Sequence, residues 1–293
     1  MTAIRPIFSS IYLSLIALAA VFLLSVVPAK SAQAETFNTC AGFITSLPFT
    51  ITTQGTWCMK NDLTTSDGTQ GYAAITVATN NVTIDCNDFK LGGLAAGAAT
   101  SAAGIFADNR DNVTIRHCNI RGFYFGAYLN NGSGHLVEDN RFDGNTTNGI
   151  VVGGDRSIIR RNLVIATGGL NDRTYGIYSS GSVDILDNTV NRVTSGSVNG
   201  NSYGIYTANN PDGRISGNSV RGVVKGGSGT AYGIYTFSSG RIMLGNNQVV
   251  GDGSAGSIGL YCNSAQGRAT GNVVGGFATN ISTCSGTSNE IVY

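Results

Sequence analysis

A four-residue phrase recurs along this chain at nearly even spacing. Residues 175–178, 203–206 and 232–235 all read Tyr-Gly-Ile-Tyr. With less regular copies included, the glycine of the phrase falls at positions that lie 22 to 29 residues apart, namely Gly104, Gly126, Gly149, Gly176, Gly204, Gly233 and Gly259. A repeat of this length predicts a solenoid, in which each repeat is one coil and the stacked coils share a continuous core.

An asparagine follows the phrase in most repeats. It lies 12 to 14 residues after the glycine, whereas 8 to 16 residues separate this position from the next glycine. These residues are Asn140, Asn162, Asn188, Asn218, Asn247 and Asn272, with Cys118 at the same position after Gly104. Length variation on one side of a coil predicts loops that border the glycine-containing strand, at residues 166–174, 194–202, 224–231 and 251–257.

The composition favours short strands over helices. The chain has 41 Gly and only 12% charged residues, and its Val, Ile and Tyr residues recur in register. Glycine and β-branched residues suit turns and strands better than helices. The regular recurrence of apolar residues also argues against a disordered chain rich in glycine and serine. We therefore expect an all-β protein.

The N-terminal residues predict export. Arg5 precedes a long apolar run at residues 7–27, and residues 32–34 read Ala-Gln-Ala, which fits a signal-peptide cleavage site. We expect a signal peptide at residues 1–34 and a secreted, periplasmic or cell-surface protein. An uncleaved membrane anchor is the alternative, since the run is long enough to span a bilayer. The remaining chain carries 16 basic and 17 acidic groups, so neither nucleic acid nor a membrane surface is an expected partner.

The chain after the signal peptide is expected to form a cap at residues 35–72 and a repeat domain at residues 73–293. Residues 49–52 and 57–59 are expected to be short strands that flank a turn at residues 54–55. A solenoid must cover the core and the strand edge at its ends, and these strands would do so.

The six cysteines fall into pairs whose spacing suits a bridge within the cap or between neighbouring coils. Such a bridge would contribute about 2–4 kcal/mol. Sequence alone does not determine the pairing, and buried free thiols are the alternative. The expected bridges are Cys40–Cys58, Cys86–Cys118 and Cys262–Cys284.

Stacking of the coils would bring equal residues together. Side chains alternate along a strand, so the apolar residue after each glycine points inward and the aromatic residue after it points outward. With coils about 4.8 Å apart, the asparagines form a ladder at the bend after the second strand of each coil. An unpaired buried polar group costs about 1–3 kcal/mol, which explains an amide that can bond to its copy in the next coil.

The glycine–isoleucine–tyrosine strands and the asparagine ladder resemble the right-handed parallel β-helix proteins of the pectin lyase-like superfamily, with repeats of the PbH1 type. The resemblance covers about residues 70–284. It implies a right-handed parallel β-helix, and the repeats suggest about eight or nine coils. It also implies that the asparagine ladder lies between the second and third strands and that the first strand and the variable loop before it line a substrate cleft.

An aromatic row is expected on the outward face of the first strand. Aromatic rings with polar groups at their rim suit sugars, whose C–H faces stack on rings while their hydroxyls bond at the edge. The alternative is that the rings only stack on one another and stabilise neighbouring strands. The row is Val77, Phe106, Tyr128, Val151, Tyr178, Tyr206, Tyr235 and Tyr261, of which the six aromatic residues are the candidate ligand-binding residues.

The second strand carries charges of alternating sign. One row consists of Asp85, Arg116, Glu138 and Arg160, and the adjoining bend carries His117, Asp139, Arg161 and Asp187. Stacked ion pairs, each worth about 0–1 kcal/mol, are the favoured interpretation. The alternative is an acid–base cluster, in which His117, Asp139 and Arg161 are the candidate catalytic residues.

The aromatic row lacks the residues that the usual enzymes of the resembling superfamily need. A lyase of that type uses acidic calcium ligands beside a basic residue, and a glycosidase uses two carboxylates. No charged residue occupies the row, and the chain has only two His. We therefore expect no metal and no cofactor. Calcium held between loops by Asp85, Asp108 and Asp111 is the alternative.

The favoured hypothesis is an exported protein that binds a polysaccharide or cell-surface glycan along its first-strand face. The runner-up is a carbohydrate-active enzyme, namely a polysaccharide lyase, a glycoside hydrolase or an epimerase, as the resemblance implies. A structural or adhesive surface protein is the third hypothesis. An enzyme would bring Asp, Arg and His from adjacent coils into one cleft, whereas a binding protein would present tyrosine side chains without such a cluster.

Overall fold

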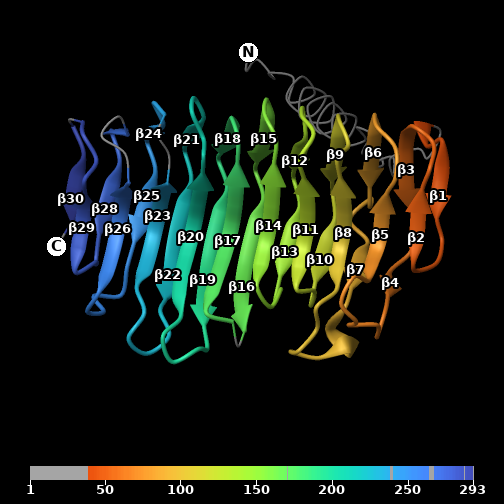
Figure 1. Cartoon of the computed structure of the whole chain (residues 1–293), viewed down its shortest axis with the longest axis horizontal. Helices are drawn as coiled ribbons and strands as arrows, with labels where there is room; N and C mark the ends of the chain where they lie inside the picture. The colour runs from red at the N-terminus through yellow and green to blue at the C-terminus, as the bar shows by residue number, and fades with distance from the viewer. Residues whose placement is uncertain (1–38, 170, 238–239, 264–266, 287, 293) are drawn as a thin grey trace, which may run out of the picture. The chain divides into compact units, whose positions relative to one another are not determined.

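The chain winds into coils of three short strands, and equal strands of successive coils pair side by side (Figure 1). The structure is a computed structural model that describes residues 39–169, 171–237, 240–263, 267–286 and 288–292. Strands β2 to β28 fall into nine successive triplets, each with one strand in each of three sheets. Every strand pair in the described residues is parallel, so the predicted all-β solenoid is confirmed.

The first sheet contains the glycine-containing strands. Its strands are β2 (Phe49–Ile51), β5 (Ala73–Val77), β8 (Ala103–Asp108), β11 (Phe125–Asn130), β14 (Asn148–Gly153), β17 (Arg173–Ser180), β20 (Asn201–Ala208), β23 (Ala231–Phe237), β26 (Ser257–Cys262) and β29 (Thr279–Ser282). Figure 1 shows them side by side, with the loops that precede them along one edge. The predicted variable loops lie between the third strand of one coil and the first strand of the next, but residues 166–169 and 173–174 of the first predicted loop belong to strands.

The second sheet follows the first along each coil. Its strands are β1 (Gly42–Ile44), β3 (Gly55–Met59), β6 (Val82–Asp85), β9 (Val113–Arg116), β12 (Leu136–Glu138), β15 (Ser157–Arg160), β18 (Val183–Leu186), β21 (Arg214–Ser216), β24 (Met243–Gly245) and β27 (Arg268–Thr270).

The third sheet completes each coil. Its strands are β4 (Leu63–Thr64), β7 (Lys90–Gly92), β10 (Asn119–Arg121), β13 (Arg141–Asp143), β16 (Leu163–Gly169), β19 (Thr189–Ser195), β22 (Ser219–Val224), β25 (Gln248–Val250), β28 (Val273–Gly275) and β30 (Glu290–Val292). A short 3-10 helix, η2 (Leu94–Ala96), lies in the loop between β7 and β8.

The core is a stack of aliphatic side chains from the three sheets. Ile177 pairs in register with Ile205, and Ile205 pairs with Ile234, so the residue after each phrase glycine forms an inward column. All three are fully buried. The prediction that this position faces inward is correct, and β-branched residues suit this like-on-like stacking because they pack well on a pleated surface.

The glycine of the phrase also faces inward. A Cβ atom at Gly176 would lie 2.5 Å from a methyl of Val190 and 2.6 Å from the carbonyl oxygen of Gly204. Gly176 and Ile177 therefore both point toward the core, and the strand loses one step of its alternation there. As a result, Tyr175 and Tyr178 both lie on the outer face of the first sheet.

The asparagine ladder runs along the bend between the second and third sheets. Each side-chain Nδ2 donates to the Oδ1 of the asparagine in the next coil at 2.9–3.0 Å, from Asn140 through Asn162, Asn188, Asn218 and Asn247 to Asn272. The column continues to Asn289, and the backbone N–H of Cys118 donates to Asn140 at its other end. The residue before each asparagine adopts a left-handed conformation, for example Asp139 with φ of 55° and Arg161 with φ of 53°.

Three disulfides close the described cysteines in the pairs that their spacing predicts: Cys40–Cys58, Cys86–Cys118 and Cys262–Cys284. The register of β6 on β9 leaves Cys86 and Cys118 one position out of phase. The bend of this coil holds two more residues than the bend of the next coil, and Asn87 and Asp88 there both have positive φ. A local bulge therefore permits this bridge.

The N-terminal segment differs in detail from a separate cap. The strands expected at residues 49–52 and 57–59 are present as β2 and β3, but together with β4 they pair with β5, β6 and β7 and make a complete first coil. Strand β1 then covers the edge of β3. The expected signal peptide at residues 1–34 lies outside the described residues. Within the described ranges, no helix has the length and apolar character needed to cross a bilayer.

Candidate functional site

The outer face of the first sheet carries two parallel rows of aromatic side chains. The expected row is present from Phe106 through Tyr128, Val151, Tyr178, Tyr206 and Tyr235 to Tyr261, each paired in register with the next. Val77 was wrongly placed in it. Val77 pairs with Ala107 on the inner face and is only 2% exposed, so Thr76 takes the row position beside Phe106.

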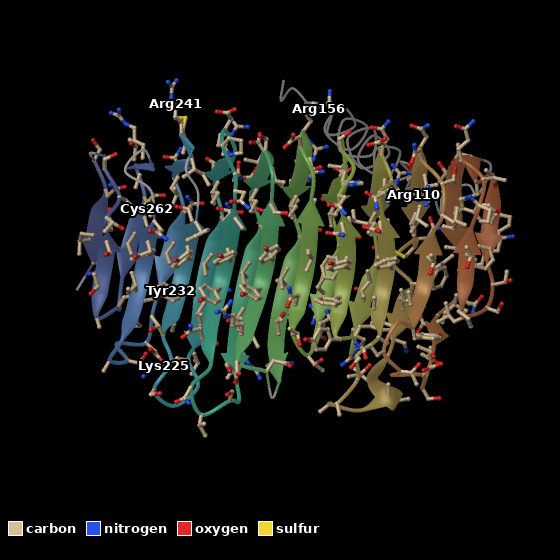
Figure 2. All side chains as sticks on the ribbon, in the orientation of Figure 1. Arg110, Arg156, Lys225, Tyr232, Arg241 and Cys262 are labelled. Atoms are coloured by element: carbon tan, nitrogen blue, oxygen red, sulfur yellow. A yellow bond between two sulfur atoms is a disulfide. The ribbon has the colours of Figure 1, made fainter. Side chains whose placement is uncertain are left out.

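A second row lies three residues earlier in each strand. It consists of Phe125, Asn148, Tyr175, Tyr203 and Tyr232, again in register. These residues were not predicted from the sequence, because strict alternation along the strand would turn Tyr175 toward the core. The sequence did contain a sign of this row, namely the tyrosine at each end of the four-residue phrase. Both tyrosines can lie on the same face of the sheet only because the glycine between them points inward. Figure 2 shows Tyr232 on this face, while Arg110, Arg156, Arg241 and Lys225 lie at its edges.

The rings of each row stack on one another. Ring centroids are 5.3 Å apart between Tyr178 and Tyr206, and 5.1 Å apart between Tyr206 and Tyr235, with interplanar angles of 14°. In the second row, Tyr203 lies 4.9 Å from Tyr175 and 5.0 Å from Tyr232. Rings of the two rows meet edge to face, for example Tyr203 and Tyr206 at 5.1 Å and 76°. Each stacked ring therefore covers its neighbour's face and turns mainly its edge to solvent.

Partial burial raises the pKa of five phenols in these rows. Burial, with a smaller effect from Tyr203, raises the pKa of Tyr175 to about 12, and the nearby charge of Arg173 acts in the opposite direction. Burial is also the main cause that raises the pKa of Tyr178, Tyr203, Tyr206 and Tyr235. The hydroxyls are thus available as hydrogen-bond donors and acceptors over the physiological pH range.

Two adjoining cavities open on this face, with volumes of about 550 and 660 Å³. They share Tyr124, Phe125, Tyr128 and Asn171 in their linings. The first extends toward residues 70–73, and the second extends across β14 toward Tyr178. Together they form a groove that crosses the strands and follows the axis of the solenoid.

Polar groups line the groove beside the rings. Asn130 lines the second cavity and donates to Oδ1 of Asp108 at 2.8 Å. Asn171, which lies in the variable loop before β17, donates to the hydroxyl of Thr147 at 2.5 Å. Asp172 and Arg173 are the charged residues of the two linings, and the serine hydroxyl of Ser197 donates to Asp172. The groove therefore offers amides and hydroxyls with no net charge.

The candidate catalytic residues lie elsewhere, on the bend after the second sheet. His117 contacts Asp85 at 3.2 Å, and Asp85 also pairs with Arg116 at 2.8 Å. Arg161 contacts Oδ2 of Asp139 at 2.6 Å, and its hydrogen bond is the main cause that lowers the pKa of Asp139.

Arg161 also links this bend to the charged row of the second sheet. It contacts Glu138 at 2.8 Å, and Glu138 pairs with Arg160 at 2.7 Å. These charges are thus paired between neighbouring coils, as the favoured interpretation expected, whereas Asp187 forms no ion pair among the described residues. His117, Asp139 and Arg161 share one column but do not reach the aromatic groove, because the bend and the groove belong to different sheets.

No metal centre is formed by the described residues, in which no group of three or more His, Cys, Asp or Glu side chains could hold an ion. Asp108 accepts hydrogen bonds from Asn109, Asn130 and Asn131. Asp111 accepts one from Ser133, and Asp85 is paired with Arg116. The three acids considered for calcium are therefore each engaged by protein groups.

The arrangement defines a parallel β-helix with an aromatic groove on its first sheet. A family model described as the right handed beta helix region matches residues 51–199, and the chain belongs to this family. No curated protein matches the sequence.

Several solved structures are similar to this chain at low identity. The Dettilon tailspike protein gp208 has a TM-score of 0.43 and 18% identity, over 85% of this chain and 60% of that one. The A-module of mannuronan C-5 epimerase AlgE4 from Azotobacter vinelandii has a TM-score of 0.42 and 13% identity, over 80% of this chain and 76% of that one. The catalytic domain of a GH87 alpha-1,3-glucanase in complex with nigerose has a TM-score of 0.37 and 12% identity, over 86% and 60%. The chain thus spans about 60% of the tailspike and glucanase chains, and the likeness concerns the fold alone.

Proposed function

We propose that the protein binds a polysaccharide or cell-surface glycan along the outer face of its first sheet. The observation that carries this proposal is the groove formed by the two adjoining cavities, which share three aromatic residues and Asn171. A groove that follows the solenoid axis suits an extended chain of similar units better than a single small molecule.

The chemistry of the groove favours sugars over other extended ligands. Aromatic rings pack against the C–H faces of a sugar, and amides and hydroxyls bond to its hydroxyl groups. A nucleic acid or an acidic peptide would need a basic surface, whereas the linings contain one basic residue, Arg173, beside one acidic residue, Asp172. The three disulfides favour an oxidising compartment, where such glycans would be met.

Binding without turnover is the form of the proposal that the groove supports. Glycoside hydrolysis uses two carboxyl groups on either side of the scissile bond, and the groove linings provide only Asp172. The described charges that do cluster, around Arg161, are already neutralised by ion pairs on another sheet.

A glycan-array screen with product analysis tests this proposal. We expect the secreted protein to bind a subset of glycans and to release neither unsaturated nor reducing-end products. A triple variant with Phe125→Ala, Tyr128→Ala and Tyr178→Ala, three rings that line the groove, should lose binding, with circular dichroism as the check on folding. Asp139→Ala should bind as the wild type does. An array without binding, or a turnover that Asp139→Ala abolishes, would refute the proposal.

A further inference from the structure

Both aromatic rows are interrupted at the same coil. Strand β14 carries Asn148 and Val151 at the two row positions. The strands on either side carry a pair of rings each, Phe125 and Tyr128 in β11 and Tyr175 and Tyr178 in β17. We call the gap above Asn148 and Val151 the notch. It lies in the larger cavity, whose lining includes all six residues.

The notch has the width of one missing ring. Neighbouring coils are about 4.8 Å apart, so the rings of β11 and β17 are separated by about 9–10 Å. A flat ligand in contact with a ring on each side would need only about 7–8 Å. A puckered pyranose ring is thicker, because axial C–H groups project from both of its faces, and it suits the wider gap. At the notch no ring of β14 stands between Tyr128 and Tyr178, or between Phe125 and Tyr175 in the second row.

The floor of the notch holds a polar group without a partner. Asn148 is only 5% exposed, and its Oδ1 has no hydrogen-bond partner among the described residues. Leaving a buried acceptor unpaired costs about 1–3 kcal/mol, and the asparagines of the ladder avoid this cost by pairing with each other. Asn148 lines the larger cavity although its Oδ1 exposes less than 1 Å², so a turn of the amide brings that oxygen within reach of a ligand hydroxyl.

We propose that the notch binds one neutral, gluco-configured pyranose residue of the glycan, inserted between the rings of Tyr128 and Tyr178. This proposal rests on the proposed function and specifies its central subsite. A gluco-configured ring carries its hydroxyls equatorially, so both faces present C–H groups to the two rings. A galacto- or manno-configured ring turns one axial hydroxyl toward an aromatic face. The equatorial hydroxyls at the inserted edge reach Asn148, and the balance of Asp172 with Arg173 favours a neutral sugar.

Filling the notch tests this proposal without removing any ring. Val151→Tyr places a tyrosine where its neighbours in register are Tyr128 and Tyr178, so it continues the stack and closes the gap. Ser282→Tyr is the matched control, because Ser282 pairs with Tyr261 at the end of the same row, far along the sheet from the notch. Asn148→Tyr fills the notch from the second row and serves as an independent variant should Val151→Tyr not fold.

The probes are cellohexaose and laminarihexaose as gluco-configured chains, with mannohexaose and β-1,4-galactohexaose for comparison, measured by isothermal titration calorimetry. We expect a gluco-configured probe to bind at least about tenfold more tightly than the other two. Val151→Tyr should weaken that binding at least about tenfold, and Ser282→Tyr should change it less than about twofold.

The outcomes separate this proposal from the proposed function. Wild-type affinity in both Val151→Tyr and Asn148→Tyr would overturn the notch as a subsite and leave glycan binding intact. Preference for the manno- or galacto-configured probe, or array binding that includes no gluco-configured glycan, would overturn the sugar assignment alone. An array on which the wild-type protein binds nothing would overturn the proposed function and this inference with it.

Discussion

The asparagine column and the aromatic rows both form by stacking of equal residues in successive coils, but only the asparagine column pairs all of its groups. In both, one residue type repeats in successive coils and meets its own copy. Asn162 is 2% exposed, donates to Asn188 at 3.0 Å and to the carbonyl of Val137 at 2.8 Å, and accepts from Asn140. The column is thus closed, and a ligand has no group left to bind.

The aromatic rows remain open. Most of their rings are half-buried, and both rows break at β14, where Asn148 keeps an unpaired oxygen. A repeat that continues without interruption saturates its own contacts and acts as a structural element. A repeat that is interrupted exposes ring faces and polar atoms on either side of the gap. The departure from the repeat, more than the repeat itself, marks the candidate site.

The largest effect is expected from breaking the closed column. Asn188→Ala removes the acceptor for the backbone N–H and side-chain Nδ2 of Asn162, and it leaves the carbonyl of Ile159 unpaired. With several buried groups orphaned at about 1–3 kcal/mol each, we expect a loss of more than about 3 kcal/mol in the free energy of unfolding. The midpoint of urea denaturation measures it. Asn199→Ala, in an exposed loop, is the control and should cost less than about 1 kcal/mol.

A smaller effect is expected in the continuous part of the aromatic rows. Tyr206→Ala removes stacking on Tyr178 and Tyr235 and edge contacts with the second row. Each such pair contributes about 0.5–1.5 kcal/mol, so we expect a loss of about 2 kcal/mol in the same denaturation experiment. Tyr206→Phe keeps the ring and should stay within about 0.5 kcal/mol of the wild type. If Asn188→Ala and Tyr206→Ala cost the same, the contrast between a closed column and open rows is wrong.

Much of the fold was predictable from the sequence because a solenoid converts spacing directly into contacts. Once the glycines and asparagines are aligned, the partner of each residue is its copy one repeat later. The inward isoleucines and the cysteine pairs follow from that alignment. Val77 was misplaced because its coil, the second, has Ala74 in place of the glycine of the phrase, so its register had no marker.

The site was only partly predictable. The first aromatic row follows from alternation, but the second depends on the loss of one step at the phrase glycine, which is a three-dimensional effect of the missing Cβ. The notch could be seen in the sequence as Asn148 and Val151 in place of tyrosines. It could be proposed as a binding site only from the structure, which shows that both positions lie on one face and that the Oδ1 of Asn148 is unpaired.

The smallest effect is expected from the charged bend, where pH sharpens the contrast with the buried column. The hydrogen bond from Arg161 holds the pKa of Asp139 below its ordinary value in the folded state. A lowered folded-state pKa means that the pair stabilises the protein above the unfolded pKa of about 3.9, and that this contribution is lost as the pH falls through the folded value. The side chains are substantially exposed, so Asp139→Asn should cost less than about 1 kcal/mol at neutral pH. The difference from the wild type should shrink below about pH 4, as measured by urea denaturation across pH. Asp212→Asn is the control, because it removes an exposed carboxylate without an ion pair among the described residues, and its difference in stability from the wild type should not shrink at low pH. A cost of Asp139→Asn that does not change with pH would show that Asp139 supports the bend through its conformation and not through its charge.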